Sequence, residues 1–335
     1  MGGRTFVIAE AGANHNRCID QAKALIDAAV DAGADACKFQ TYSSNTLYAK
    51  QTGDFAGYRN INQLIKDLEL PRHWQKELKN YCDDAGIEFM STPFDERAVD
   101  ELLQIGVKRL KIAGFESTDP RFVRMVASAK LPIIVSAGIG NNLSSVSNTI
   151  SWVKLEQQNP DITVLHCNNA YPTPDSDINL SNIDVLKKIY QGIKVGLSDH
   201  TTGIMAPILA VAKGATCVEK HFTLSRHLPG PDHPFALEPK ELKDMVTQIR
   251  RAESMCSISD NKLTDSEKQF SNAMRSVVAK VDIASGTVLN EDLITTMRPL
   301  TEKSVPAYEY YNVIGKILKK SIGKNELVNW EDISC

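Results

Sequence analysis

Short apolar, β-branched runs alternate with segments of helical periodicity along most of this chain. The runs predict strands at 5–10, 36–40, 87–91, 108–112, 132–136, 162–167, 193–198 and 216–222. Helices are predicted at 18–32, 71–85, 95–105, 119–129, 143–157, 179–190, 203–213 and 238–253. Such alternation over about 250 residues is typical of a (β/α)₈ TIM barrel, an α/β fold whose chemistry lies at the carboxyl ends of the strands.

Composition narrows the class of protein. The chain has 335 residues, 42% of them hydrophobic, and a formal net charge of −3, which suits one large domain with a small appendage. Its interspersed charges form no basic stripe, so we expect no nucleic-acid partner. No apolar run approaches the length of a membrane span, so we expect no membrane partner either. The start lacks a signal-peptide core and the seven cysteines show no C-x-x-C spacing, which favours a cytoplasmic protein with reduced thiols.

The chain changes character after residue 254. A polar, partly helical stretch is followed by short β-like pieces and turns. The segments DIASGTVL and SIGKNELV indicate two turn-linked hairpins, in which Gly286 and Gly323 supply positions that tolerate positive φ. We therefore predict a barrel domain at 1–256, a linker at 257–278 and a small β-rich domain at 279–335.

Two histidines, His200 and His221, follow or end neighbouring predicted strands. Imidazoles that reach one point from adjacent strand ends could hold a divalent metal ion, with water and substrate oxygens in the remaining positions. A single histidine at such a place is more often an ordinary polar loop residue. The polar neighbours Ser198, Glu219 and Asp232 favour the metal site.

Polar side chains recur where one predicted strand after another ends. They are Glu10, Lys38, Gln40, Thr92, Lys111, Glu116, Ser136, Asn169, Tyr171 and Ser198. A barrel core is built from Val, Ile and Leu, so Lys38 and Lys111 are costly there unless they serve an anion, such as a small phosphorylated or carboxylated substrate. The alternatives are snorkelling lysine stems, salt bridges from Glu10 and Glu116 to the lysines, and backbone capping by the hydroxyls.

A series of short motifs extends along nearly the whole chain. In order they are IAEAGANHN, CKFQT, STPFD, LKIAGFES, VSAGI, LHCNNAYPTP, GLSDHT, EKHFTL and PGPDH. These motifs resemble those of the sialic acid synthase family, which comprises the N-acetylneuraminate synthases and the related legionaminate and pseudaminate synthases. The C-terminal segment, with its Arg298-Pro299 pair, resembles the antifreeze-like SAF (β-clip) domain of that family. The resemblance implies a TIM barrel followed by a SAF domain.

The family's activity is implied in the same way. The resemblance implies a transferase that condenses phosphoenolpyruvate with an N-acetylated sugar aldehyde and water, giving a nine-carbon 2-keto sugar acid and phosphate. N-acetylmannosamine, which would give N-acetylneuraminate, is the first acceptor to consider. A 2,4-diacetamido-2,4,6-trideoxyhexose, which would give legionaminate or pseudaminate, is the alternative. A Schiff-base aldolase that uses Lys111 or Lys220, and a non-catalytic sugar-binding protein, are the other classes considered.

The resemblance also assigns roles to individual residues. It implies catalytic roles for Glu10 and Glu116, and metal binding by His200 and His221, with Mn²⁺ before Mg²⁺ or Co²⁺. Phosphoenolpyruvate would be held by Lys38, Thr92, Lys111, Ser136, Asn169 and Ser198. The sugar would be contacted by Tyr171 and Asp232.

Two residues outside the barrel receive roles in the same way. Lys268 would approach the phosphate, and Arg298 would enter the partner's site in a domain-swapped homodimer. One position departs from the family pattern, because Gly114 stands where many synthases have a serine. A hydrogen bond to the phosphate would then have to come from elsewhere.

Overall fold

The computed structural model describes residues 3–54, 57–139, 143, 145–257 and 263–334. The chain divides into two compact units, Met1–Ile258 and Ser259–Cys335. Part of the predicted linker, residues 258–262, lies outside the described residues. Strand β9 (Ser276–Ala279) of the second unit begins ahead of the domain start predicted at residue 279.

Eight parallel strands form the sheet of the first unit, in the order β3-β2-β1-β8-β7-β6-β5-β4. They are β1 (Phe6–Gly12), β2 (Ala36–Thr41), β3 (Glu88–Pro93), β4 (Leu110–Ile112), β5 (Ile133–Ala137), β6 (Ile162–Cys167), β7 (Lys194–Asp199) and β8 (Cys217–His221). The first and last strands pair in register, Val7 with Val218 and Glu10 with His221. Strands β3 and β4, at the two ends of the order, also contact one another. The predicted (β/α)₈ barrel is confirmed.

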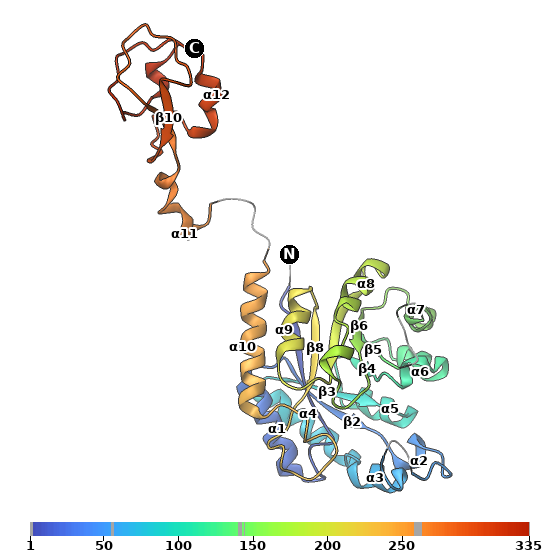
Figure 1. Ribbon diagram of the computed structural model, residues 1–335. Coiled ribbons are helices and arrows are strands. Elements are labelled where there is room, and N and C mark those ends of the chain that lie inside the picture. Colours follow the sequence, from blue (N-terminus) through green and yellow to red (C-terminus); the bar gives the residue numbers. More distant parts are fainter. Residues whose placement is uncertain (1–2, 55–56, 140–142, 144, 258–262, 335) are drawn as a thin grey trace. The chain divides into compact units, whose positions relative to one another are not determined.

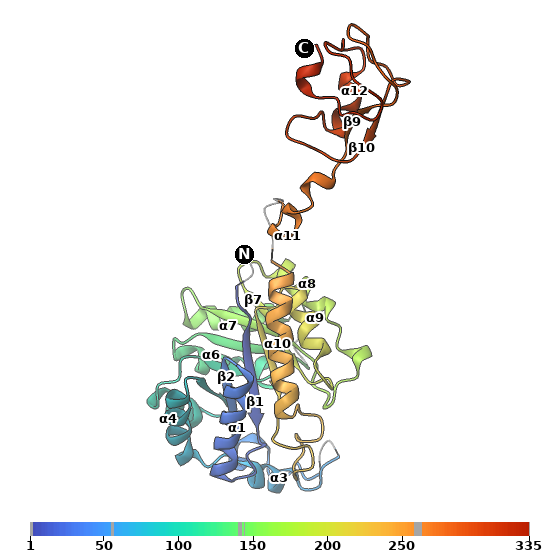
Figure 2. The same cartoon turned by 90° about the vertical axis from the view of Figure 1, so that its left-hand side faces the viewer.

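Helices surround this sheet (Figure 1). They are α1 (Ile19–Ala32), α2 (Ser44–Leu47), α3 (Ile61–Leu68), α4 (Gln75–Ala85), α5 (Glu96–Gln104), α6 (Pro120–Ser128), α7 (Val146–Glu156), α8 (Ser181–Ile189), α9 (Met205–Ala212) and α10 (Pro239–Met255). Helix α10 packs between α1 and α9 (Figure 2). It begins with a capping box of Glu238 and Glu241 around Pro239, which satisfies backbone N–H groups that the first turn leaves unpaired. No helix in the described ranges is long and apolar enough to cross a membrane.

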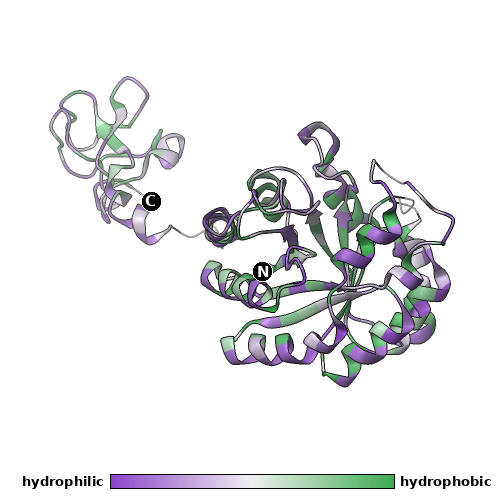
Figure 3. Ribbon diagram, turned by 90° about the horizontal axis from the view of Figure 1, so that it is seen from below, coloured by the Kyte–Doolittle hydropathy of each residue, from purple (hydrophilic) through white to green (hydrophobic). Residues whose placement is uncertain are grey.

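The barrel interior is filled in layers, because successive strand residues face opposite sides of the sheet. One apolar cluster inside the barrel is formed by Ile8, Ala36, Met90, Ile134, Leu165 and Cys217. Hydrophobic colour is concentrated along the strands, while the helices carry both kinds of residue (Figure 3). Two positions further along five of these strands, toward their carboxyl ends, the residues are polar and buried: Glu10 on β1, Lys38 on β2, Thr92 on β3, Ser136 on β5 and Glu219 on β8. The apolar cluster is therefore the floor of a polar layer.

The second unit contains an antiparallel pair, β9 and β10 (Ile294–Met297), and short helices α11 (Asp265–Lys268) and α12 (Tyr310–Val313). Its core is made by Val277, Ala279, Ile283, Leu289, Ile294, Val305, Val313, Leu318, Ile322, Val328 and Ile333.

The two local hairpins predicted in the small domain are wrong. Ile283 of the first segment pairs with Ile322 of the second, and Val288 pairs with Ile317. Both members of the first pair are buried in one core, so long-range packing decides the pairing. Gly286 does have positive φ, at 86°, but in the second segment Asn325 takes this role at 67°, in place of Gly323.

One glycine of the barrel sheet tests how tightly its interior is packed. A Cβ added at Gly196 would lie 2.2 Å from the carbonyl oxygen of Cys217 and 2.7 Å from Leu165 Cδ2. We expect Gly196→Ala to lower the free energy of unfolding by about 1–3 kcal/mol, because backbone must move to admit the methyl group. Urea denaturation measures this loss. Gly3→Ala, whose added Cβ meets no heavy atom within 4 Å, is the matched control. Wild-type stability for Gly196→Ala would contradict the packing described.

Candidate active site

A layer of buried polar side chains lies on the apolar floor, at the carboxyl side of the barrel. It contains Glu10, Lys38, Thr92, Lys111, Ser136, Ser198 and Glu219, each at most 5% exposed. Strand register aligns them, since Glu10 is opposite Lys38 on β2 and Ser198 is opposite Glu219 on β8. The structure thus brings the predicted residues of six different strands into one layer.

The ammonium of Lys38 is the centre of one half of this layer. Its Nζ lies 2.7 Å from Glu10 Oε2 and donates to Thr92 Oγ1 at 2.8 Å. Gln40 Nε2 donates to the other oxygen of Glu10 at 2.9 Å. Burial raises the pKa of Glu10 to about 7, although Lys38 opposes the shift. Burial alone would lower the pKa of Lys38, but the attraction of Glu10 and Glu219 raises it. Glu10 can therefore exchange a proton near neutral pH.

Glu219 is the central carboxylate of the layer. From the sequence we named it only as a polar neighbour of His221 and predicted no catalytic or binding role for it. Its two oxygens lie 3.6 Å from Lys111 Nζ and 3.7 Å from Lys38 Nζ, and Ser198 Oγ donates to it at 3.2 Å. Lys111 Nζ also donates to Ser136 Oγ at 2.7 Å. Burial would raise the pKa of Glu219, but Lys111 and Lys38 outweigh it and lower the value. The two-residue spacing from His221 in one strand was the signal that could have identified it.

The two histidines lie above this layer, with ring centroids 5.4 Å apart. His200 Nδ1 is 2.6 Å from the carbonyl oxygen of Asn168, an acceptor, so Nδ1 carries the proton and Nε2 presents its lone pair. His221 Nδ1 is buried and has no hydrogen-bond partner among the described residues. Burial lowers the pKa of both histidines, so both imidazoles are neutral at neutral pH.

This donor set fits a divalent metal ion with open coordination positions. Neutral imidazole is the form that binds metal, and a carbonyl on the remote nitrogen orients the ring. Within the described ranges no group of three or more His, Cys, Asp or Glu side chains forms a metal cage. The protein would therefore supply two nitrogen ligands, and water or substrate oxygens would supply the rest.

The space at Gly114 is taken by the side chain of Asn169. A Cβ at Gly114 would lie 3.0 Å from both terminal atoms of that amide, and a Cβ at Gly138 would lie 1.9 Å from its Oδ1. The backbone N–H of Ile139 donates to Oδ1 at 2.7 Å and fixes the amide in place. Two glycines thus admit a polar side chain, from the loop that follows β6, to the position where the family pattern described above has a serine.

The remaining predicted barrel residues lie around the mouth. Glu116 begins a short 3₁₀ turn (Glu116–Thr118) after β4, and burial raises the pKa of its carboxyl. The Tyr171 ring lies 4.2 Å from the His200 ring, centroid to centroid. Asp232 Oδ2 is 3.8 Å from His221 Nδ1, and burial raises the pKa of this aspartate to about 6. An aromatic ring and a carboxyl, those of Tyr171 and Asp232, therefore lie beside the histidine pair.

A cavity of about 450 Å³ opens beside His221 and Asp232. Most of its wall comes from the loop between β2 and α4 and from apolar residues near it. The lining includes Gln40, Tyr42, Leu47, Tyr58, Ile61, Leu64, Ile65, Leu68, Phe94, Phe115, Asn169 and Tyr171. Neither Lys nor Arg occurs in the described part of this lining. The cavity thus joins an apolar wall to a polar end at His221 and Asp232.

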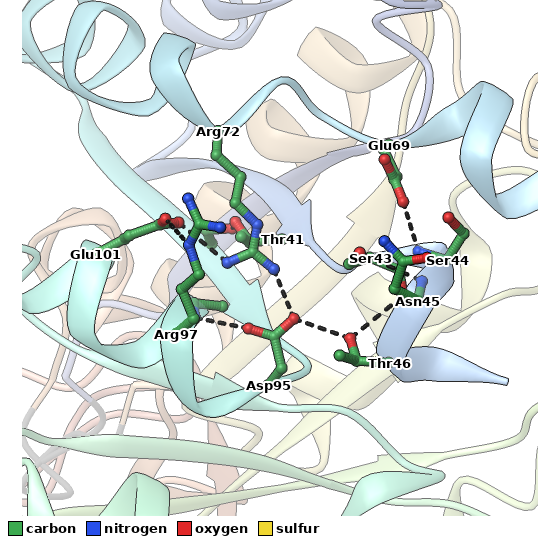
Figure 4. Close-up of polar contacts among 12 residues, drawn as sticks. Thr41, Ser43, Ser44, Asn45, Thr46, Glu69, Arg72, Asp95, Arg97 and Glu101 are labelled. Atoms are coloured by element: carbon green, nitrogen blue, oxygen red, sulfur yellow. Dashed lines mark hydrogen bonds and ion pairs between the residues drawn. The ribbon is translucent and has the colours of Figure 1, made fainter. Parts of the chain in front are cut away.

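Arg72 fastens the loop that forms this wall (Figure 4). Its guanidinium lies 2.5 Å from Asp95 Oδ2 and 3.0 Å from Glu101 Oε2, at the start and within helix α5. Thr46 Oγ1 donates to the same Asp95 oxygen at 3.0 Å, and the backbone N–H of Ser44 donates to Glu69. These contacts tie the loop between β2 and α4 to α5 and fix its own two ends together.

Two predicted site residues, Lys268 and Arg298, belong to the second unit. Lys268 is exposed, and its Nζ donates to Asp265 Oδ1 at 2.6 Å. Arg298 directly follows β10 and is also exposed. Their assigned roles remain predictions.

Two protein families match this chain, one over most of the barrel unit and one over most of the second unit. The NeuB family matches residues 25–260, and the SAF domain matches residues 274–334. N,N'-diacetyllegionaminic acid synthase of Legionella pneumophila is 38% identical over 98% of this chain and 95% of its own length. Pseudaminic acid synthase of Campylobacter jejuni is 35% identical, with 95% and 94% covered. The crystal structure of N-acetylneuraminic acid synthetase from Leptospira borgpetersenii, in complex with citrate, has 34% identity, a TM-score of 0.73, and coverage of 80% of this chain and 90% of that chain.

Fold, site and matches define a TIM-barrel protein with a polar, histidine-bearing mouth and a C-terminal SAF domain. The chain belongs to the NeuB family, whose members include sialic acid, legionaminate and pseudaminate synthases. The family and the SAF domain predicted from the sequence motifs are confirmed.

The charge balance of the buried layer is open to a direct test. We expect Lys38→Met to destabilise the protein by about 3–5 kcal/mol at pH 8, because it leaves Glu10 and Glu219 buried without their shared cation. The folded-state pKa of Glu10 is already raised, and loss of Lys38 raises it further. Folding of Lys38→Met then favours the protonated form of Glu10. The variant therefore keeps its stability near the unfolded-state pKa of a glutamate, about 4.3, and loses it as pH rises through the raised folded-state pKa of Glu10. The destabilisation should therefore be smaller at pH 5.

Urea denaturation at pH 5 and pH 8 measures both values. The double variant Lys38→Met/Glu10→Gln removes one orphaned charge and should regain part of the loss at pH 8. Equal destabilisation at the two pH values would contradict the electrostatic explanation.

Proposed function

We propose that this protein condenses phosphoenolpyruvate with an N-acetylated sugar aldehyde and water, and releases phosphate and a nine-carbon 2-keto sugar acid. The observation that carries the proposal is the buried layer in which Lys38 and Lys111 lie beneath the imidazoles of His200 and His221. It combines cationic donors for an anionic substrate with two imidazoles whose nitrogens would bind the metal. The legionaminic and pseudaminic acid synthases among the relatives support the same class of reaction.

The donor substrate would occupy the polar layer. Lys38 and Lys111 would hold its carboxylate and phosphate, with the hydroxyls of Thr92, Ser136 and Ser198 as further donors. The amide of Asn169 would replace the hydrogen bond that the family pattern places at position 114. An arriving anion must compete with the carboxylates for the two ammonium groups. The carboxylates also repel an arriving anion. Glu10, whose pKa is about 7, can take up a proton and so reduce both the repulsion and the competition.

The reaction would take place between this layer and the histidines. His200 and His221 would hold a divalent ion, Mn²⁺ in preference to Mg²⁺ or Co²⁺, and such an ion when bound supplies Lewis-acid polarisation of the aldehyde oxygen. C3 of phosphoenolpyruvate bonds to the aldehyde carbon, which leaves C2 electron-poor. Water then adds at C2, and Glu10 or Glu116 accepts its proton before phosphate leaves.

The apolar wall bears on the choice of sugar. Tyr171 and Asp232 would contact the acceptor beside the histidines, which leaves its far end against Leu47, Ile61 and Phe94. A methyl group suits that wall better than a hydroxymethyl or a phosphate. This favours a 2,4-diacetamido-2,4,6-trideoxyhexose over N-acetylmannosamine, the acceptor that we considered first from the sequence.

A Schiff-base aldolase has less support. Lys220 Nζ lies 2.6 Å from Asp199 Oδ2 and also donates to the carbonyl of Thr201, so it is held outside the polar layer. Lys111 Nζ is engaged in a hydrogen bond to Ser136 Oγ at 2.7 Å. Borohydride added with substrate should therefore cause no inactivation, whereas a metal chelator should abolish turnover.

A panel of acceptors tests both the reaction and the sugar. Phosphate release is measured with phosphoenolpyruvate, Mn²⁺ and each of N-acetylmannosamine, its 6-phosphate and the two 2,4-diacetamido-2,4,6-trideoxyhexoses of manno and L-altro configuration. We expect kcat/KM for one trideoxyhexose to exceed that for N-acetylmannosamine by about tenfold or more, and the 6-phosphate to be the poorest. His221→Ala is the control for contaminating activity.

Two results would contradict the proposal at different levels. Preference for N-acetylmannosamine would overturn the choice of sugar and leave the condensation standing. No phosphate release with any of the four sugars would overturn the condensation itself.

We also propose that the protein is a domain-swapped homodimer in which the SAF domain of each subunit completes the other subunit's site. The proposal rests on Arg298, which is exposed after β10 and resembles the arginine that contacts the sugar in the family. A small domain has little core of its own and is stabilised by docking on a partner.

Mixing two inactive chains tests the shared site. In a heterodimer of Arg298→Ala with His200→Ala, one site would lack both residues and the other would lack neither. We expect activity to return in the mixture, because one of the two sites in each heterodimer, about half of the sites, is intact. If no activity returns although subunits demonstrably exchange, the cross-subunit site is wrong.

A further inference from the structure

Asp199 and Lys220 directly precede the two site histidines and stand outside the polar layer. Asp199 ends β7, Lys220 precedes His221 in β8, and the two are opposite one another in the parallel ladder. Side chains alternate along a strand, so Lys220 points away from the barrel interior that Glu219 and His221 face. The pair thus lies at the last shared rung of the two strands that carry the histidines.

This ion pair is fully buried and has several partners. Lys220 Nζ is 2.6 Å from Asp199 Oδ2, and the two side chains are 1% and 0% exposed. Asp199 accepts from the backbone N–H of Thr201 at 3.0 Å and from its hydroxyl at 3.1 Å. The Lys220 ammonium also donates to the Thr201 carbonyl. Both charges therefore hold the residue that directly follows His200.

Other contacts hold the two histidines from their remaining sides. The His200 carbonyl accepts from Thr173 N–H at 2.9 Å, and the His200 ring donates from Nδ1 to the Asn168 carbonyl. The His221 carbonyl accepts from Leu237 N–H at 3.0 Å. These contacts attach each histidine to a different loop, whereas the Asp199–Lys220 pair connects one histidine strand to the other.

We propose that the Asp199–Lys220 ion pair sets the separation of the His200 and His221 imidazoles and is a positioning pair for a divalent metal ion. This inference rests on the proposed function, since it requires metal at the histidines. An apolar pair could fill the same space without the cost of burying two charges, so stability alone gives little reason for it. A directional, multiply bonded pair restricts sliding between the strand ends, and metal ligands must be placed within about 0.2 Å.

Three variants separate positioning from simple stabilisation. Lys220→Met and Asp199→Asn each break the pair, while the double variant Asp199→Asn/Lys220→Met leaves neither charge buried alone. The full-length, metal-stripped protein is titrated with Mn²⁺ by calorimetry, its Tm is recorded, and the visible spectrum is taken with Co²⁺ bound. We expect Tm to fall in Lys220→Met and to recover in the double variant.

Metal binding should not recover with Tm. We expect the Kd for Mn²⁺ to rise by about 10–100-fold in all three variants, with a changed Co²⁺ spectrum. Leu78→Ala, a truncation at a buried position of α4, is the control for a comparable loss of Tm and should bind Mn²⁺ as wild type does. Wild-type Kd and Co²⁺ spectrum in the folded double variant would overturn the positioning role.

A second control keeps this result distinct from the proposed metal site. His200→Ala should abolish measurable Mn²⁺ binding. If His200→Ala binds Mn²⁺ as wild type does, the metal site itself is wrong, and the positioning role is overturned with it. If His200→Ala loses the metal and the double variant does not, only the positioning role is overturned.

Discussion

Four charged side chains share one buried layer of the barrel, where water cannot screen them. Glu10 and Lys38 lie 2.7 Å apart, and Glu219 lies within 3.7 Å of both Lys38 and Lys111. Each charge would be prohibitively costly alone, so the four form a balanced set. The apolar floor beneath them keeps the local dielectric low, which strengthens any interaction with an anion that enters. The rest of the site depends on this arrangement.

The cavity above the layer separates two kinds of chemistry. Charged and hydroxyl groups face the barrel axis, the neutral imidazoles lie at the boundary, and the loop held by Arg72 presents apolar side chains further out. Under the proposed function, the anion would lie on the charged side of the histidines and the acetamido sugar on the apolar side. The Asp199–Lys220 pair lies behind the strands, where it can govern the spacing of the histidines without touching either substrate.

The barrel could be predicted because its signal is local and repeated. Hydrophobic periodicity predicts the strands and the amphipathic helices from short stretches of sequence. Because the carboxyl ends of the strands converge at one face of a parallel barrel, Lys38, Lys111 and the histidines could be assigned to that face. Pairing between distant residues carries no such signal. The position of Asn169 over Gly114, and the pairing of Ile283 with Ile322 in place of a local hairpin, depend on packing that composition and spacing do not encode.

Steady-state kinetics of Lys111→Ala test most directly whether the charged layer binds phosphoenolpyruvate, as we propose. The variant removes a cation that contacts Ser136 and faces Glu219. Charge-assisted hydrogen bonds are worth about 1.5–3 kcal/mol, so the apparent KM for phosphoenolpyruvate should rise about tenfold to a hundredfold. The KM for the sugar should change little. An equal rise in both KM values, or no change in either, would contradict the account.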